Sequence, residues 1–277
     1  MKTSASSEIL EIALDTWNTR FSEMISLITT SPSEFMDGQI YEKVKGVEEA
    51  LCAVSYSLLT LFFLIGVFSV TVSFESLKRP ESALRLFVRF SCAKVLIDKG
   101  GEILNAVTAI AALIVKAAVG TFSDAAFDAA SLPEEVLEAA SGATFLQSIP
   151  LFAVSLIAAL MVFTLAIKMT LTVYGRFFKI YLYQAASPLA FSALGGETTA
   201  VFAKNFIRSY ASVCLEGLMI ALCLIIFSFF ASSAPAAAEG KSAVSVVWRY
   251  MGNLIFNMLI LNFMIESSDK VVREMIY

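Results

Sequence analysis

The chemically reactive side chains of this 277-residue chain offer little to an enzyme. Histidine, the commonest general base and metal ligand, does not occur in the sequence. Gly240-Lys241-Ser242 is similar to the end of a phosphate-binding loop, but position 235 is proline where that loop needs glycine. The cysteines lie among apolar residues without the spacing of zinc or redox motifs, which predicts small buried side chains. They are Cys52, Cys92, Cys214 and Cys223. We therefore expect a protein that is not an enzyme and that holds no cofactor and no metal.

The sharpest polar pattern is formed by Arg249, Asn253 and Asn257, which recur every four residues in an apolar stretch. On an α-helix, this spacing places the three side chains on one face. Such a face is not expected to contact lipid. It either binds a neighbouring helix or lines a pore or other wet cavity, and both interpretations remain open.

Two further charges, Lys168 and Glu216, lie inside apolar stretches. Burying a charge in hydrocarbon costs about 2.5 to 3.5 kcal/mol on insertion scales, so such residues are expected to be paired or to face water. Both residues lie toward the same end of their stretches. We expect an ion pair between them.

Basic residues cluster in two connecting segments, 75–99 and 174–208. A basic surface can attract the phosphates of nucleic acid or anionic lipid. Any membrane protein also gathers such residues on its cytoplasmic side, and this simpler interpretation is favoured. The candidate basic face consists of Lys78, Arg79, Arg85, Arg89, Lys94, Arg176, Lys179, Lys204 and Arg208.

Apolar helices must position these residues. The chain is 58% hydrophobic and 16% charged, whereas soluble domains are typically about 25% charged. Five stretches are long enough to cross about 30 Å of hydrocarbon. The predicted fold is therefore all-α, a polytopic transmembrane bundle of about five spans that occupies residues 50–265. The predicted spans are about 51–74, 103–122, 149–173, 209–233 and 244–265.

Residues 1–49 are expected to form an amphipathic helical region outside the membrane. Apolar residues recur at intervals of three and four between Leu10 and Ile28, as on one face of a helix. The other face is acidic, so we expect it to contact protein or the outer membrane surface rather than anionic lipid, with packing on its own bundle favoured. Ser31 to Glu34 matches a capping box, which predicts a short helix that starts there.

Two local signals interrupt the apolar pattern. Gly100 and Gly101 separate the first basic connector from the second span. The stretch 185–194, which contains Pro188, is too short to cross a bilayer and is interpreted as a re-entrant or surface segment.

The loop charges predict an orientation. Basic loops tend to remain in the cytoplasm. Segments 75–99 and 174–208 are basic, whereas 123–147 carries only acidic charges. The amino terminus is therefore expected outside, and residues 266–277 are expected to form a short cytoplasmic tail.

Two longer segments resemble a known family. They are YGRFFKIYLYQAASPLAFSALGG at Tyr174–Gly196 and FAKNFIRSYASVCLEGLMIAL at Phe202–Leu222. A span ends in aromatic and basic residues, a Ser-Pro-Leu-Ala segment follows, and a basic, aromatic helix leads into the next span. This arrangement resembles the TrbL-like polytopic inner-membrane subunits of conjugative type IV secretion systems. The specific resemblance covers about 151–226, and the amino-terminal half agrees in general layout.

The resemblance implies a structural channel component of the bacterial cytoplasmic membrane. Family members help to pass single-stranded DNA with its bound protein, beside other membrane subunits and a separate ATPase. We expect a homo-oligomer, because five spans could hardly enclose a conduit for DNA alone. Two other classes remain open, a small-molecule or ion transporter and a membrane scaffold without a pore. A transporter is expected to show midplane charges or broken helices, whereas the charges here lie toward the ends of the spans.

Overall fold

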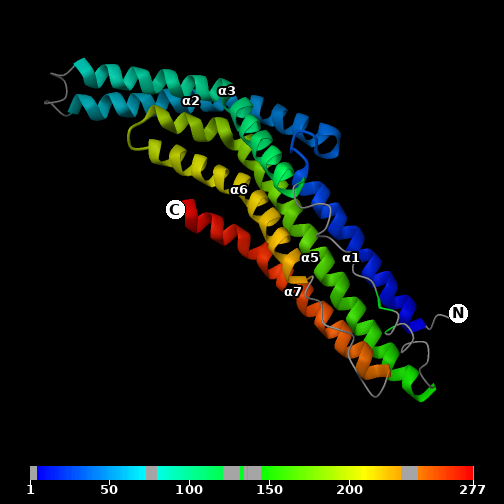
Figure 1. Cartoon of the computed structure of the whole chain (residues 1–277). Coiled ribbons are helices and arrows are strands. Elements are labelled where there is room, and N and C mark those ends of the chain that lie inside the picture. The colour runs from blue at the N-terminus through cyan, green and yellow to red at the C-terminus, as the bar shows by residue number, and fades with distance from the viewer. Residues whose placement is uncertain are drawn as a thin grey trace. The chain divides into compact units, whose positions relative to one another are not determined.

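The computed structural model describes residues 5–72, 80–120, 132–133, 136, 145–231 and 243–276 (Figure 1). Within these ranges the chain forms α-helices and two short 3₁₀ helices, and no strand. This confirms the all-α prediction. The elements are α1 (Ala5–Thr29), η1 (Phe35–Gly38), α2 (Gln39–Val72), α3 (Pro80–Gly120), α5 (Phe145–Ser192), η2 (Ala193–Gly195), α6 (Ala200–Ala231) and α7 (Ala243–Ile276).

Among the described residues, five helical segments are long and apolar enough to cross a membrane, which confirms the predicted number. They correspond to α2 with the preceding η1, α3, α5 with the following η2, α6 and α7. By length and composition, the chain is thus a multi-pass membrane protein. The candidate segments are Phe35–Phe68, Leu84–Gly120, Ser148–Gly195, Ala200–Phe227 and Val244–Ile276.

The helices continue past the points where the sequence suggested breaks. α3 runs through Gly100 and Gly101, whose missing side chains make room for the Phe191 ring and the Glu48 carboxylate. A helical glycine costs only about 1 kcal/mol relative to alanine, which such packing can offset. α5 also continues through Pro188 to Ser192, so the stretch 185–194 is mostly part of this helix. The acidic loop 123–147 lies largely outside the described residues.

The turn between α1 and α2 differs from the capping-box prediction. The backbone N–H groups of Glu34 and Phe35 both donate to the Ser31 carbonyl, which makes a turn. The short helix begins later, at Phe35, and is a 3₁₀ helix. Met36 and Asp37 within it have left-handed backbone angles, with φ of 50° and 56°, and Gly38 follows with φ 73°. Three consecutive left-handed residues thus form a tight local turn directly before α2.

The structure divides into two compact units. Unit 1 comprises residues 1–29, 115–174 and 218–270. It contains α1, the first part of α5, the second part of α6 and most of α7. The apolar side of α1 is buried in this unit, which confirms the predicted amphipathic helix. The buried residues of that side include Leu10, Ala13, Leu14, Trp17, Met24 and Ile28.

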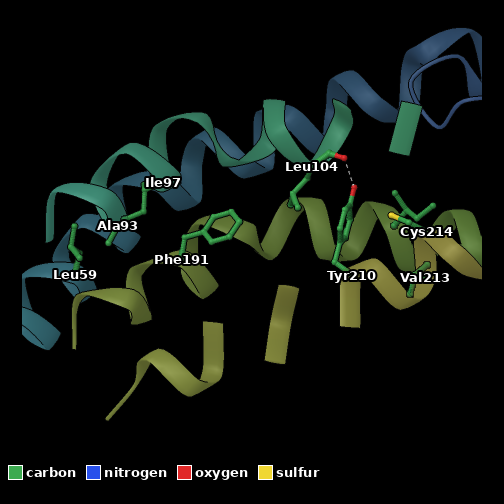
Figure 2. Packing of buried hydrophobic residues seen from close by; sticks show 9 residues of the cluster. Leu59, Ala93, Ile97, Leu104, Phe191, Tyr210, Val213 and Cys214 are labelled. Atoms are coloured by element: carbon green, nitrogen blue, oxygen red, sulfur yellow. Dashed lines mark hydrogen bonds between the residues drawn. The ribbon is translucent and has the colours of Figure 1, made fainter. Parts of the chain in front are cut away.

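Unit 2 comprises residues 30–114, 175–217 and 271–277. α2 and α3 form an antiparallel pair in it, because Cys52 Sγ donates to the Ile97 carbonyl at 3.7 Å while the Phe63 and Phe90 rings pack with centroids 4.9 Å apart. The predicted connector 75–99 therefore packs, from Pro80 onward, beside the first predicted span. A core of nine residues joins this pair to α5 and α6 (Figure 2). The Tyr210 hydroxyl in it donates to the Leu104 carbonyl at 2.8 Å.

Candidate functional site

Arg176 is the most deeply buried charge of unit 2. Its side chain is 1% exposed, and its Nε donates to the Val213 carbonyl on α6 at 3.4 Å. Its Nη1 has no hydrogen-bond partner among the described residues. The guanidinium lies against Gly217, where a Cβ would come within 2.5 Å of Nη1. The structure thus removes Arg176 from the predicted basic face and places it between α5 and α6.

Lys179 and Glu216 form an ion pair next to this arginine. The Lys179 Nζ lies 3.3 Å from Glu216 Oε2, and the glutamate side chain is 2% exposed whereas the lysine is 38% exposed. Burial of a carboxylate is costly unless cations and hydrogen bonds offset it. The contact between α5 and α6 in unit 2 therefore contains an ion pair whose carboxylate is buried.

Lys168 binds a different residue from the one expected. In unit 1 its Nζ lies 2.7 Å from Oε2 of Glu266 on α7, and both side chains are about half exposed. The structure thus pairs Lys168 with Glu266 and Lys179 with Glu216, in place of Lys168 with Glu216. Sequence reasoning missed Glu266 because it lies in the predicted tail 266–277, which is helical as far as Ile276. The available signal was the uninterrupted helical pattern after the last span.

Four members of the candidate basic face have exposed side chains in unit 2. They come from two helices, α3 and the beginning of α6. Arg89 on α3 binds Glu197, which lies just before α6, and its Nη2 is 3.4 Å from the glutamate Oε1. Lys78 and Arg79 lie outside the described residues. The exposed cations are Arg85, Lys94, Lys204 and Arg208.

The predicted polar stripe of α7 lies in unit 1. Arg249 is exposed, and Asn253 and Asn257 are partly buried. The buried residues of this helix, such as Val247, Met251, Ile255 and Met258, occupy a different face. Neither asparagine side chain makes a hydrogen bond with another described residue. The stripe therefore lies beside the buried face of α7, whereas the most exposed side of the helix carries Trp248, Phe256 and Phe263.

The carboxyl-terminal end of α1 lies against α5 in unit 1. The Tyr174 hydroxyl donates to Glu23 Oε1 at 3.2 Å, and Glu23 Oε2 accepts from Arg20 Nη1 at 2.6 Å. The amphipathic helix is thus packed on its own bundle, as the sequence favoured. No group of three or more cysteine, aspartate or glutamate side chains that could hold a metal ion occurs within the described ranges.

Comparison with known proteins identifies one family. Residues 17–188, more than half of the chain, match the family model of the TrbL/VirB6 plasmid conjugal transfer like protein. No curated protein and no solved structure matches the chain. The matched range begins within α1, includes α2 and α3, which lie outside the segment 151–226 that carried the resemblance in sequence, and ends within α5.

Proposed function

Because the chain belongs to the TrbL/VirB6 family of plasmid conjugal transfer proteins, we propose that it is a structural subunit of the passage for single-stranded DNA with bound protein in a conjugative type IV secretion apparatus. The family match over residues 17–188 carries this proposal. The five candidate spans support a membrane component of conjugal transfer. In the proposed role, the subunit acts in the cytoplasmic membrane without catalysis, and a separate ATPase supplies the energy.

The exposed cations of unit 2 support the DNA part of the proposal. Arg85, Lys94, Lys204 and Arg208 are basic residues with exposed side chains. Cations that contact phosphates release condensed counterions, which favours binding of any nucleic-acid sequence. A passage for DNA needs this kind of sequence-independent attraction.

The same residues support the proposed orientation. They lie in the segments 75–99 and 174–208, and the positive-inside rule assigns such segments to the cytoplasm. The amino terminus would then lie outside and the carboxyl terminus inside. Several copies would surround the passage, because five spans could hardly enclose a conduit for DNA alone.

Deletion and complementation test this function. The gene is deleted from the conjugative element and supplied in trans, and DNA transfer is counted while the other membrane subunits are quantified by immunoblot. We expect transfer to be lost on deletion and restored by complementation, with the other subunits still present. Normal transfer, or a defect confined to uptake of a small solute, would contradict the proposal and favour a transporter.

A further inference from the structure

An open apolar groove lies between α5 and α7 in unit 1, with a volume of about 290 Å³. Leu165 is its buried member, whereas Leu160 and Leu259 are about half exposed. The hydroxyl of Thr164, the polar side chain of the lining, donates to the Leu160 carbonyl at 2.8 Å. The groove therefore presents hydrocarbon to whatever occupies it. The lining residues are Ile157, Leu160, Met161, Thr164, Leu165 and Leu259.

The groove ends at the ion pair between the same two helices. On α5, Lys168 lies one turn, about 5 Å, beyond Leu165, and on α7, Glu266 lies about 10 Å beyond Leu259. The two side chains meet at 2.7 Å, so α5 and α7 run parallel along the groove and reach the ion pair together. An apolar channel and a charged group thus follow one another along the helix axis.

This end of the groove is expected to lie where hydrocarbon gives way to headgroups. The fifth apolar stretch ends just before Glu266, and the residues that follow as far as Lys270 are polar. Charged side chains are costly in hydrocarbon, and both members of the ion pair are about half exposed. A long lysine side chain can also extend its ammonium toward the membrane surface.

The ion pair retains donors for an anion. A lysine ammonium has three N–H donors, and Glu266 is the acceptor that Lys168 binds among the described residues. Lys270 is exposed, follows Glu266 by one helical turn on the same face of α7, and lies close enough to act on it electrostatically. Two cations and one carboxylate give this end of the groove one net positive charge.

A phospholipid matches both features, because its acyl chain is apolar and its phosphate lies at the membrane boundary. We propose that unit 1 binds one phospholipid, with an acyl chain in the groove and the phosphate at Lys168 and Lys270. The surrounding bilayer is as apolar as the groove, so the phosphate contact provides the preference for this site. This lipid site does not depend on the proposed role in conjugal transfer.

A lipid titration followed by native mass spectrometry tests the site. The full chain is purified in detergent, freed of lipid and titrated with phosphatidylglycerol, and we expect one saturable binding event. Lys168→Met with Lys270→Met is expected to weaken the affinity about tenfold, through loss of two charge-assisted contacts. Lys116→Met removes an exposed lysine from another candidate span and is expected to leave the affinity unchanged. Binding that does not saturate, or equal affinity in the double variant, would overturn the proposal.

Glu266→Gln separates phosphate binding from a purely structural role of the ion pair. The substitution removes the acceptor that competes with phosphate for Lys168, and it removes a repelling charge. We expect phosphatidylglycerol to bind about threefold more tightly. If the ion pair only held α5 against α7, binding would weaken or stay the same, and either result would overturn the phosphate contact.

Two competitors and one further substitution test each half of the site. Diacylglycerol has acyl chains without phosphate and glycerol phosphate has the reverse, so neither is expected to displace phosphatidylglycerol. Displacement by either would overturn the proposal, in favour of a plain hydrocarbon groove or a free phosphate site. Leu259→Trp fills the groove and is expected to lower the affinity about threefold, through lost contacts with the chain. Leu222→Trp on α6 is the matched control, since it is also exposed but does not line the groove.

Discussion

At the scale of single residues, the position of Arg176 depends on a neighbour that has no side chain. Its guanidinium lies over the backbone of α6 at Gly217 and donates to the Val213 carbonyl. The sequence predicted Arg176 at a basic surface, because arginine is rarely buried and nothing in its own segment indicates the contact. The glycine that makes room for it lies on another helix. Only the packing of α5 against α6 shows the relation between the two.

Gly217→Ala tests this contact. The added Cβ would lie within 2.5 Å of Arg176 Nη1, so either the guanidinium or α6 must shift. We expect a loss of about 1 to 3 kcal/mol in stability, as for other overpacked cores. The measurement is thermal unfolding of the purified protein in detergent. Gly175→Ala is the matched control, since a Cβ there meets no atom within 4 Å, and it is expected to leave stability unchanged or to raise it.

The left-handed turn before α2 provides a second test at this scale. A non-glycine residue in this conformation costs about 1 to 2 kcal/mol. Met36 adopts it at φ 50° and ψ 47° with an exposed side chain, so Met36→Gly is expected to raise the melting temperature. Gly38→Ala places a Cβ at φ 73°, only 3.1 Å from the Ser33 carbonyl, and is expected to lower it. Equal effects of the two substitutions would contradict the assigned backbone.

At the scale of elements, α5 forms ion pairs with two different helices in two different environments. Lys179 pairs with the buried Glu216 of α6, and Lys168 pairs with the half-exposed Glu266 of α7. An uncompensated buried carboxylate costs far more than an exposed pair is worth. The two pairs should therefore contribute unequally to stability.

The prediction is that Lys179→Met destabilises the protein more than Lys168→Met. Because Lys179 is partly exposed, solvent screens part of its attraction to Glu216. We expect the free energy of unfolding to fall by about 1 to 3 kcal/mol for Lys179→Met and by less than about 1 kcal/mol for Lys168→Met. Denaturation in detergent micelles measures both. Lys179→Arg keeps the charge and should recover part of the loss. If Lys168→Met had the larger effect, the assignment of the buried pair would be wrong.

The sequence was sufficient to predict that the membrane spans are helices and that there are five of them. It did not predict where these helices begin and end. Long apolar stretches indicate spanning helices because hydrocarbon allows few other structures. Charged residues indicate where a helix leaves the hydrocarbon. The helix itself continues past them where it packs well on a neighbouring helix. α3 shows this, since residues 80–102 continue into the predicted second span as one helix that packs on α2.

At the scale of the whole molecule, the basic residues of unit 2 provide the test of DNA binding. Lys204→Gln with Arg208→Gln is expected to lower transfer without changing the amount of protein in the membrane. For the solubilised protein, the slope of log affinity for a single-stranded oligonucleotide against log salt should flatten by about 1.4, since each phosphate contact contributes about 0.7. Lys204→Arg with Arg208→Lys is the control and should keep the slope. An unchanged slope in the glutamine variant would exclude these residues from contact with DNA.

The grouping of helices into two units was not visible in the sequence. Periodicity and hydropathy describe each helix separately, whereas the units depend on contacts between residues far apart in the chain. The pairing of Lys168 illustrates this limit, because Glu216 and Glu266 were equally available by type and only the register of α7 selects Glu266. The amphipathic character of α1 was predictable, since its apolar residues recur at a helical period in the sequence and are buried in the structure.

The close approach of Arg176 to Gly217 also limits which mutations the gene can accept at these two codons. Every single-base change that replaces a glycine produces either a stop codon or an amino acid with a Cβ, so no such change preserves the space that the guanidinium occupies. Arg176, in contrast, can mutate to smaller residues that fit. When the gene drifts between mobile elements, codon 217 should therefore change only after, or together with, codon 176.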